Sequence, residues 1–197
     1  ILPDNGKAFS SILISLKTRN FRLYFTGMCV SLTGTWMQQI AMSWLVYRLT
    51  GSVFLLATVT FMAQIPILLV TSLMSVFVDR FDRQKILILT QSLSMVQALS
   101  MAALTLSGVI EVWHILILSL LIGCINALDN PTRQAFYPSL VAKEHLSNAI
   151  ALNSAVINGS RLIGPAVGGV LIGIFGEGLC FLLNGISYLG VIIALFL

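Results

Sequence analysis

The sequence predicts an all-α integral membrane protein built as a bundle of six transmembrane helices. Apolar residues make up 57% of the 197-residue chain and charged residues only 9%, whereas soluble domains average about 25% charged residues. The few charges are clustered, so that long stretches contain no Asp, Glu, Lys or Arg. A membrane-spanning helix needs about 20 mostly apolar residues, and the chain has room for six. The sequence contains no alternating ten-residue strand pattern of the kind that builds a transmembrane β-barrel.

The six helices are expected at residues 21–47, 53–78, 85–107, 112–130, 147–175 and 178–197. Segments 23–47, 49–78, 86–110, 112–128 and 178–197 carry no charge, and 146–175 carries only Arg161. The first segment lacks a small-residue cleavage site, so it is interpreted as a helix and not as a signal peptide. The chain starts without Met and ends inside an apolar run. We therefore expect residues 1–197 to be either a truncated chain or one structural half, with a C-terminal half absent.

Basic residues concentrate on one side of the predicted bundle. The connections on the other side contain only Arg48. By the positive-inside rule, the N-terminus and the connection at 75–85 are cytoplasmic in a multi-pass protein of the inner or plasma membrane. The net charge of +4 reflects this topology and gives no reason to expect a nucleic-acid partner. The basic residues on the expected cytoplasmic side are Lys7, Lys17, Arg19, Arg22, Arg80, Arg83, Lys85, Arg133 and Lys143.

No catalytic or metal-binding motif is recognised. Cys29, Cys124 and Cys180 fall inside predicted spans and lack metal-ligand spacing. No phosphate loop, zinc motif or nucleophile elbow is present. We expect neither an enzyme nor a bound metal or cofactor.

Polar residues inside four of the spans recur at helical spacing, so that each set lies on one stripe. The simplest explanation for the Ser and Thr members is packing between helices. Arg161 lies near the middle of its span, where a charge costs roughly 2.5–3.5 kcal/mol, and no span has a mid-membrane carboxylate to pair with it. It is either satisfied by Asn side chains and backbone carbonyls or is a fixed positive charge in a transport pathway. The candidates for a shared polar cavity are Gln38, Gln39, Asn126, Asn158 and Arg161.

The segment GSRLIGPAVGGVLIG (159–173) is rich in glycine, beginning with Gly159. The pairs Gly164–Gly168 and Gly169–Gly173 have the small-xxx-small spacing that allows helices to approach closely. Pro165 removes a helix hydrogen bond and favours a kink. The segment suits either two bundles that rock against each other or an ordinary tight helix pair.

The charged segment SVFVDRFDRQK (75–85) resembles motif A of the major facilitator superfamily, G-x-x-x-D-R-x-x-R-[KR]. Asp79, Arg80 and Arg83 match the motif. Ser75 replaces the usual Gly, and Lys85 falls one place beyond the usual final basic residue. GSRLIGPAVGG resembles motif C of the superfamily's antiporters. Residues 20–52 and 127–141 are similar to its enterobactin-exporter-like and macrolide-efflux-like branch.

The resemblance implies a fold of twelve helices in two halves, of which this chain is the N-terminal one. It also implies a secondary transporter, with proton-coupled efflux of drug-like or siderophore-like molecules by alternating access across the lipid bilayer. Motif A then forms a cytoplasmic gate in which Asp79 faces a helix N-terminus of the other half. In the same picture Arg83 pairs with Asp129, and Arg133 joins them.

No acid of the chain lies in the middle of a span, so a proton-carrying carboxylate belongs to the absent half, or coupling works through Asp129 or Asp79. Three alternatives stay open. The membrane domain of an ATP-driven exporter also has six helices, but its cytoplasmic extensions are longer than the connection found here between the second and third spans. The others are an intramembrane enzyme and a scaffold that transports nothing.

Overall fold

The computed structural model describes residues 19–78 and 80–197, and it is all-helical apart from short connections. Five of its helices are long and apolar enough to cross a membrane, which confirms a multi-pass α-helical protein. The elements are α2 (Arg19–Thr50), α3 (Val53–Val78), α4 (Arg83–Leu106), α5 (Val112–Leu140), the 3₁₀ turn η2 (Lys143–His145), α6 (Leu146–Phe175) and α7 (Glu177–Phe196).

The helix that does not meet the criterion for crossing a membrane is α2. Its sequence includes the neighbouring amides Gln38 and Gln39 and ends near Arg48. Because α2 packs against both α6 and α7, its polar side chains can find partners on other helices. The assignment of α2 as a sixth membrane crossing stays a prediction.

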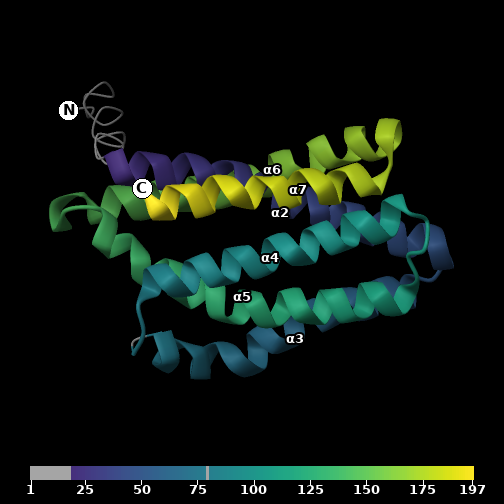
Figure 1. Ribbon diagram of the computed structural model, residues 1–197, viewed down its shortest axis with the longest axis horizontal. Coiled ribbons are helices and arrows are strands. Elements are labelled where there is room, and N and C mark those ends of the chain that lie inside the picture. The colour runs from purple at the N-terminus through teal and green to yellow at the C-terminus, as the bar shows by residue number, and fades with distance from the viewer. Residues whose placement is uncertain (1–18, 79) are drawn as a thin grey trace, which may run out of the picture.

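Helix α5 is longer than expected from the sequence, because it continues from residue 130 to Leu140. The sequence predicts an end at residue 130 because the charge-free segment stops at residue 128. The helix nevertheless includes Pro131 and Pro138, and its C-terminal part turns away from the axis of the first part (Figure 1). Proline lacks the backbone N–H and commonly bends a helix without ending it. Asp129 and Arg133 pair one turn apart across the start of this extension, and such a pair four residues apart stabilises a helix.

The helices form two layers, with α2, α6 and α7 in one and α3, α4 and α5 in the other (Figure 1). Helix α4 packs along α7 and joins the layers, while α3 packs on α5. Successive helices run in opposite directions. The start of α2, residues 80–82, the connection from α5 to α6 and the C-terminus therefore share one end of the bundle (Figure 1).

Two apolar clusters hold the bundle together, one toward each end. Met37, Met101 and Phe181 belong to one cluster, and Tyr24 and Leu87 belong to the other. Lipid tails are as apolar as these side chains, so close packing contributes most of the stabilisation that they provide within a bilayer. Tyr137 belongs both to the second cluster and to the lining of the candidate site.

Glycines of α6 allow it to approach α2 closely. A methyl group on Gly164 would lie 2.6 Å from Cβ of Trp36, and one on Gly168 would lie 2.7 Å from Cγ2 of Ile40. A methyl group on Gly169 or on Gly159 would meet no described atom within 4 Å. The structure therefore places Gly164 and Gly168 at a helix contact and Gly169 away from one, and Pro165 lies inside the helix.

We expect Gly164→Ala to destabilise the bundle by about 1–3 kcal/mol, the usual cost of overpacking. The added methyl group would also lie 2.8 Å from the carbonyl oxygen of Thr33, so backbone atoms would have to move. Thermal unfolding in detergent micelles measures the effect. The matched control is Gly169→Ala on the same helix, which should leave the melting temperature unchanged or raise it slightly, because alanine favours helix. Equal melting temperatures for the two variants would contradict the close contact.

Candidate functional site

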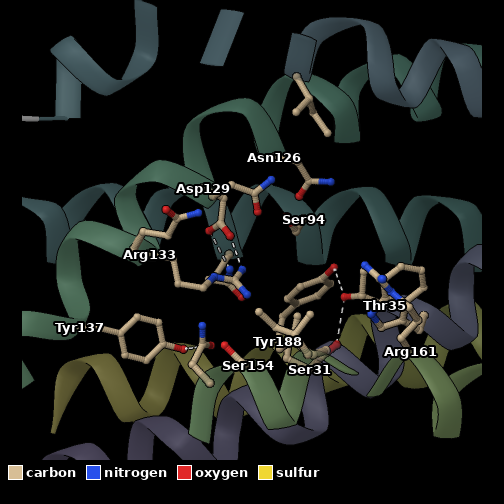
Figure 2. Close-up of a pocket in the computed structure, with 18 of the residues that line it drawn as sticks. Ser31, Thr35, Ser94, Asn126, Asp129, Arg133, Tyr137, Ser154, Arg161 and Tyr188 are labelled. Carbon is tan, nitrogen blue, oxygen red and sulfur yellow. Dashed lines mark hydrogen bonds and ion pairs between the residues drawn. The ribbon is translucent and has the colours of Figure 1, made fainter. Parts of the chain in front are cut away.

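A polar cavity of about 780 Å³ lies between the helices and receives side chains from all six of them. Its ionisable residues are Asp129, Arg133 and Arg161, together with the tyrosines Tyr137 and Tyr188. Figure 2 shows these side chains converging from different helices on one space. Among its other polar lining residues are Ser31, Thr35, Gln39, Gln64, Gln91, Ser94, Asn126, Asn130, Gln134, Asn153 and Ser154.

Five cavity residues are predicted from the sequence, and the structure brings three of them together. Gln39, Asn126 and Arg161 line the cavity from α2, α5 and α6. Gln38 is buried elsewhere. Asn158 is exposed and donates to the carbonyl oxygen of Ser154 in its own helix at 2.8 Å.

Gln38 belongs to a buried chain of amides that connects four helices. Its Nε2 donates to Oε1 of Gln97 on α4 at 3.0 Å, and its Oε1 accepts from Nδ2 of Asn184 on α7 at 2.7 Å. Gln97 in turn donates to the carbonyl oxygen of Leu118 on α5 at 3.2 Å. Gln38, Gln97 and Asn184 are all buried. Gln38 therefore contributes to helix association, where interhelical hydrogen bonds are common.

Asp129 is the carboxylate that lines the cavity, and it is almost fully buried. One of its oxygens accepts from Oγ1 of Thr90 at 2.6 Å and from Nε2 of Gln91 at 2.9 Å. The other accepts from Nη2 of Arg133 on the next turn of α5. A buried carboxylate requires such charge-assisted hydrogen bonds to offset its desolvation.

The structure departs here from the pairing that the resemblance implied. Of the described residues, the cation paired with Asp129 is Arg133 and not Arg83. Arg83 instead donates from Nη1 to the carbonyl oxygen of Ala135 at 3.0 Å. This contact joins the start of α4 to the C-terminal part of α5. Arg133 lies four residues after Asp129 on the same helix, a spacing at which opposite charges commonly pair.

Residues 80–85 of the segment that resembles motif A lie at one end of the bundle. Arg80 and Lys85 are exposed. Asp82 caps α4 by accepting from the backbone N–H groups of Gln84 and Lys85, a role that the sequence analysis missed although Asp before a helix is a common N-cap. Asp79 lies outside the described residues, and Ser75 lies within α3 with its side chain outside the description.

Arg161 projects from α6 into the cavity and is exposed there. Its guanidinium carbon lies 4.8 Å from the centroid of the Trp36 ring on α2. This distance is within the range of a cation–π interaction. Neither of the two alternatives from the sequence, a structural arginine or a transport residue, anticipated the aromatic partner.

Sequence reasoning missed the cavity residues of α4 and α7. Gln91 and Ser94 enter from α4, and Tyr188 enters from α7 with its hydroxyl 3.3 Å from Oγ1 of Thr35 (Figure 2). A signal was present, because polar residues recur on α4 at positions 90, 94 and 97 and on α7 at 184 and 188. These spacings of three and four residues place each set on one helix face.

The arrangement is suited to binding a polar or charged small molecule. It offers amide, hydroxyl and guanidinium groups together with the indole of Trp36. Within the described part of the chain, no group of three His, Cys, Asp or Glu residues is placed to hold a metal ion.

Comparison with known proteins shows the family. The family described as transmembrane secretion effector matches residues 10–197. The chain is 30% identical to the staphyloferrin A transporter of Staphylococcus aureus over 168 residues, which are 85% of this chain and 42% of that protein. It is 26% identical to macrolide efflux protein A of Streptococcus pyogenes, over 79% of this chain and 39% of that protein. It is 24% identical to the multidrug efflux pump Tap of Mycolicibacterium fortuitum, over 70% of this chain and 35% of that protein.

No solved structure matches the chain. The chain spans about two fifths of the length of the curated relatives that it matches. A bundle of membrane-crossing helices around a polar cavity agrees with a family of membrane transporters. The chain belongs to the transmembrane secretion effector family, a branch of the major facilitator superfamily of transporters.

Proposed function

We propose that the chain is the N-terminal half of a secondary active transporter that exports small molecules by alternating access. The observation that carries this proposal is a polar cavity lined by six helices, five of which are long and apolar enough to cross a membrane. Transporters commonly bind their substrates near the bilayer midplane, at the interface between structural repeats. A second six-helix half then closes the cavity, and the bundle has six crossings that include α2.

The substrates are drug-like or siderophore-like molecules. The relatives support this class, since their names refer to staphyloferrin A, to macrolides and to multiple drugs. A volume of about 780 Å³ is within the range of about 300–1,000 Å³ that is typical of small-molecule sites.

Protons are the proposed coupling ion. Asp129 is the acid that lines the cavity in the described residues, and Arg133 and two hydrogen bonds hold it. It can carry a proton only if these contacts open during the cycle. The coupling carboxylate is therefore either Asp129 in another conformation, Asp79, or an acid of the second half.

The end of the bundle that carries residues 80–85 is the proposed cytoplasmic gate, in an inner or plasma membrane. It gathers the basic residues Arg19, Arg22, Arg80, Arg83 and Lys85, whereas Arg48 lies at the opposite end. The positive-inside rule supports this orientation. The contact between Arg83 and Ala135 connects the gate to α5, the helix that carries Asp129 and Arg133.

Transport into everted membrane vesicles tests the proposal, with ethidium and a radiolabelled macrolide as probes. Uptake that is driven by a pH gradient and abolished by a protonophore is the expected result. Uptake that requires ATP in the absence of a proton gradient would support the ATP-driven alternative. Absence of any flux would leave the scaffold alternative.

We expect Asp79→Asn to abolish this uptake while membrane insertion and folding persist. The expectation rests on the resemblance to motif A, in which this acid locks the cytoplasmic face. Asp82→Asn is the matched control, because it removes an acid only three positions along the sequence and asparagine caps helices as well as aspartate does. Uptake by Asp79→Asn at the wild-type rate would contradict the gate.

A further inference from the structure

Arg161 occupies an unusual position for a cation, near the middle of a helix and open to the cavity. A charged side chain at membrane depth usually marks a functional site and pairs with an opposite charge or with backbone carbonyls. Here the partner that the structure shows is the Trp36 ring, 4.8 Å away. An aromatic face attracts a cation but accepts no conventional hydrogen bond from the edge of the guanidinium group.

The N–H donors of Arg161 meet no protein acceptor in the described part of the chain. Arginine has five such donors, arranged in a rigid fork that fits a carboxylate or a phosphate with two parallel bonds. The nearby hydroxyl of Thr35 donates to the carbonyl oxygen of Ser31 at 2.9 Å and lies 3.3 Å from the Tyr188 hydroxyl, and among the described residues no hydrogen bond joins it to Arg161. Figure 2 shows Arg161 beside Thr35 at one side of the cavity.

The cavity lining also carries an excess of positive charge. It includes two cations, Arg133 and Arg161, and one anion, Asp129. Asp129 is engaged by Arg133 on its own helix, so its charge is already balanced. The charge of Arg161 is therefore the one that stays uncompensated in the described cavity. A ligand with a negative group would supply both the missing charge and the missing acceptors.

We propose that Arg161 is the recognition residue for a carboxylate on the transported molecule. The inference rests on the proposed transport function and adds to it the chemical class of the substrate. Trp36 positions the guanidinium group by covering one face, which leaves the edge of the fork free for a bidentate contact with the carboxylate. Gln39 and Asn126, which line the same cavity, offer amide groups to polar atoms elsewhere on the substrate.

Binding of benzoate and benzamide tests the inference. These probes share size and shape and differ in charge. The protein is expressed from its complete reading frame, purified in detergent and titrated with each probe by calorimetry. We expect saturable binding of benzoate and binding of benzamide that is weaker by about tenfold or more, the loss that accompanies removal of one charged hydrogen-bond partner.

Variants locate the effect. Arg161→Gln should weaken benzoate binding about tenfold or more and leave benzamide binding unchanged, while Arg161→Lys should retain part of the preference because it keeps the charge without the fork. The matched control is Arg22→Gln, which removes one positive charge from an exposed position of α2 outside the cavity. Circular dichroism shows whether each variant retains its helix content.

Failure of this inference can be distinguished from failure of the proposed function. Vesicle uptake of ethidium or a macrolide without Arg161-dependent benzoate binding would overturn the inference and leave the transporter in place. Absence of saturable benzoate binding, or equal binding of both probes, would overturn it as well. Arg161-dependent benzoate binding in a protein that moves no probe supports the inference and contradicts the proposed function alone.

Discussion

Replacing Asp129 with leucine is expected to destabilise the helical bundle by about 3–5 kcal/mol, the cost of leaving a buried charge without its partner. The carboxylate is 2% exposed, and the paired Arg133 side chain is 16% exposed, so water can replace only a small part of the lost interaction. The substitution would also remove the acceptor of Thr90 and Gln91. Equilibrium unfolding by SDS in mixed micelles measures the change.

The double variant Asp129→Leu, Arg133→Met is the decisive control. Replacing a whole buried ion pair by apolar residues of similar size is often neutral or stabilising. We therefore expect the double variant to recover most of the stability that Asp129→Leu loses, and to lose transport if the pair belongs to the gate. The single variant Arg133→Met completes the comparison. If the double variant loses as much stability as the two single variants together, or more, Asp129 and Arg133 are not each other's main partner.

The sequence was sufficient to predict the class of fold, because a chain with so few charges cannot cover a water-facing surface. Charge-free segments placed the helices to within a few residues, except at the end of α5. There, the charge-free segment stops before Asp129, whereas the structure continues the helix to Leu140. Asp129 and Arg133 can lie inside the bundle because they pair with each other. The sequence alone does not show that they form this pair.

The site was harder to predict than the fold. Helical spacing shows which residues share a stripe, but it gives no information on which neighbour the stripe faces. Asn158 shares a stripe with Arg161 but bonds to its own helix. Tyr188 belongs to α7, which was not among the four spans with a recognised polar stripe, yet it lines the cavity. The resemblance implies an ion pair between Arg83 and Asp129, whereas in the structure Asp129 pairs with Arg133, four residues further along the chain.

The neighbouring residues Gln38 and Gln39 have the same side chain but lie in different environments, because they point in different directions from α2. Successive residues are about 100° apart around a helix, so Gln38 faces α4 and α7 while Gln39 faces the cavity. Replacing Gln38 with leucine should leave Oε1 of Gln97 and one donor of Asn184 unpaired inside the bundle. Each buried group without a partner costs about 1–3 kcal/mol. We expect a marked loss of stability in SDS unfolding and unchanged substrate preference in the folded fraction.

Gln39→Leu is the matched control, because it makes the same chemical change one residue further along α2. Gln39 is exposed in the cavity, so its loss should leave the unfolding midpoint within error and change the affinity for transported molecules. The opposite pattern, a stable Gln38→Leu variant with altered affinity, would place Gln38 in the cavity, as its sequence first indicated. The two variants together separate a residue that holds the helices in register from one that meets the substrate, because the two side chains differ in environment and not in chemistry.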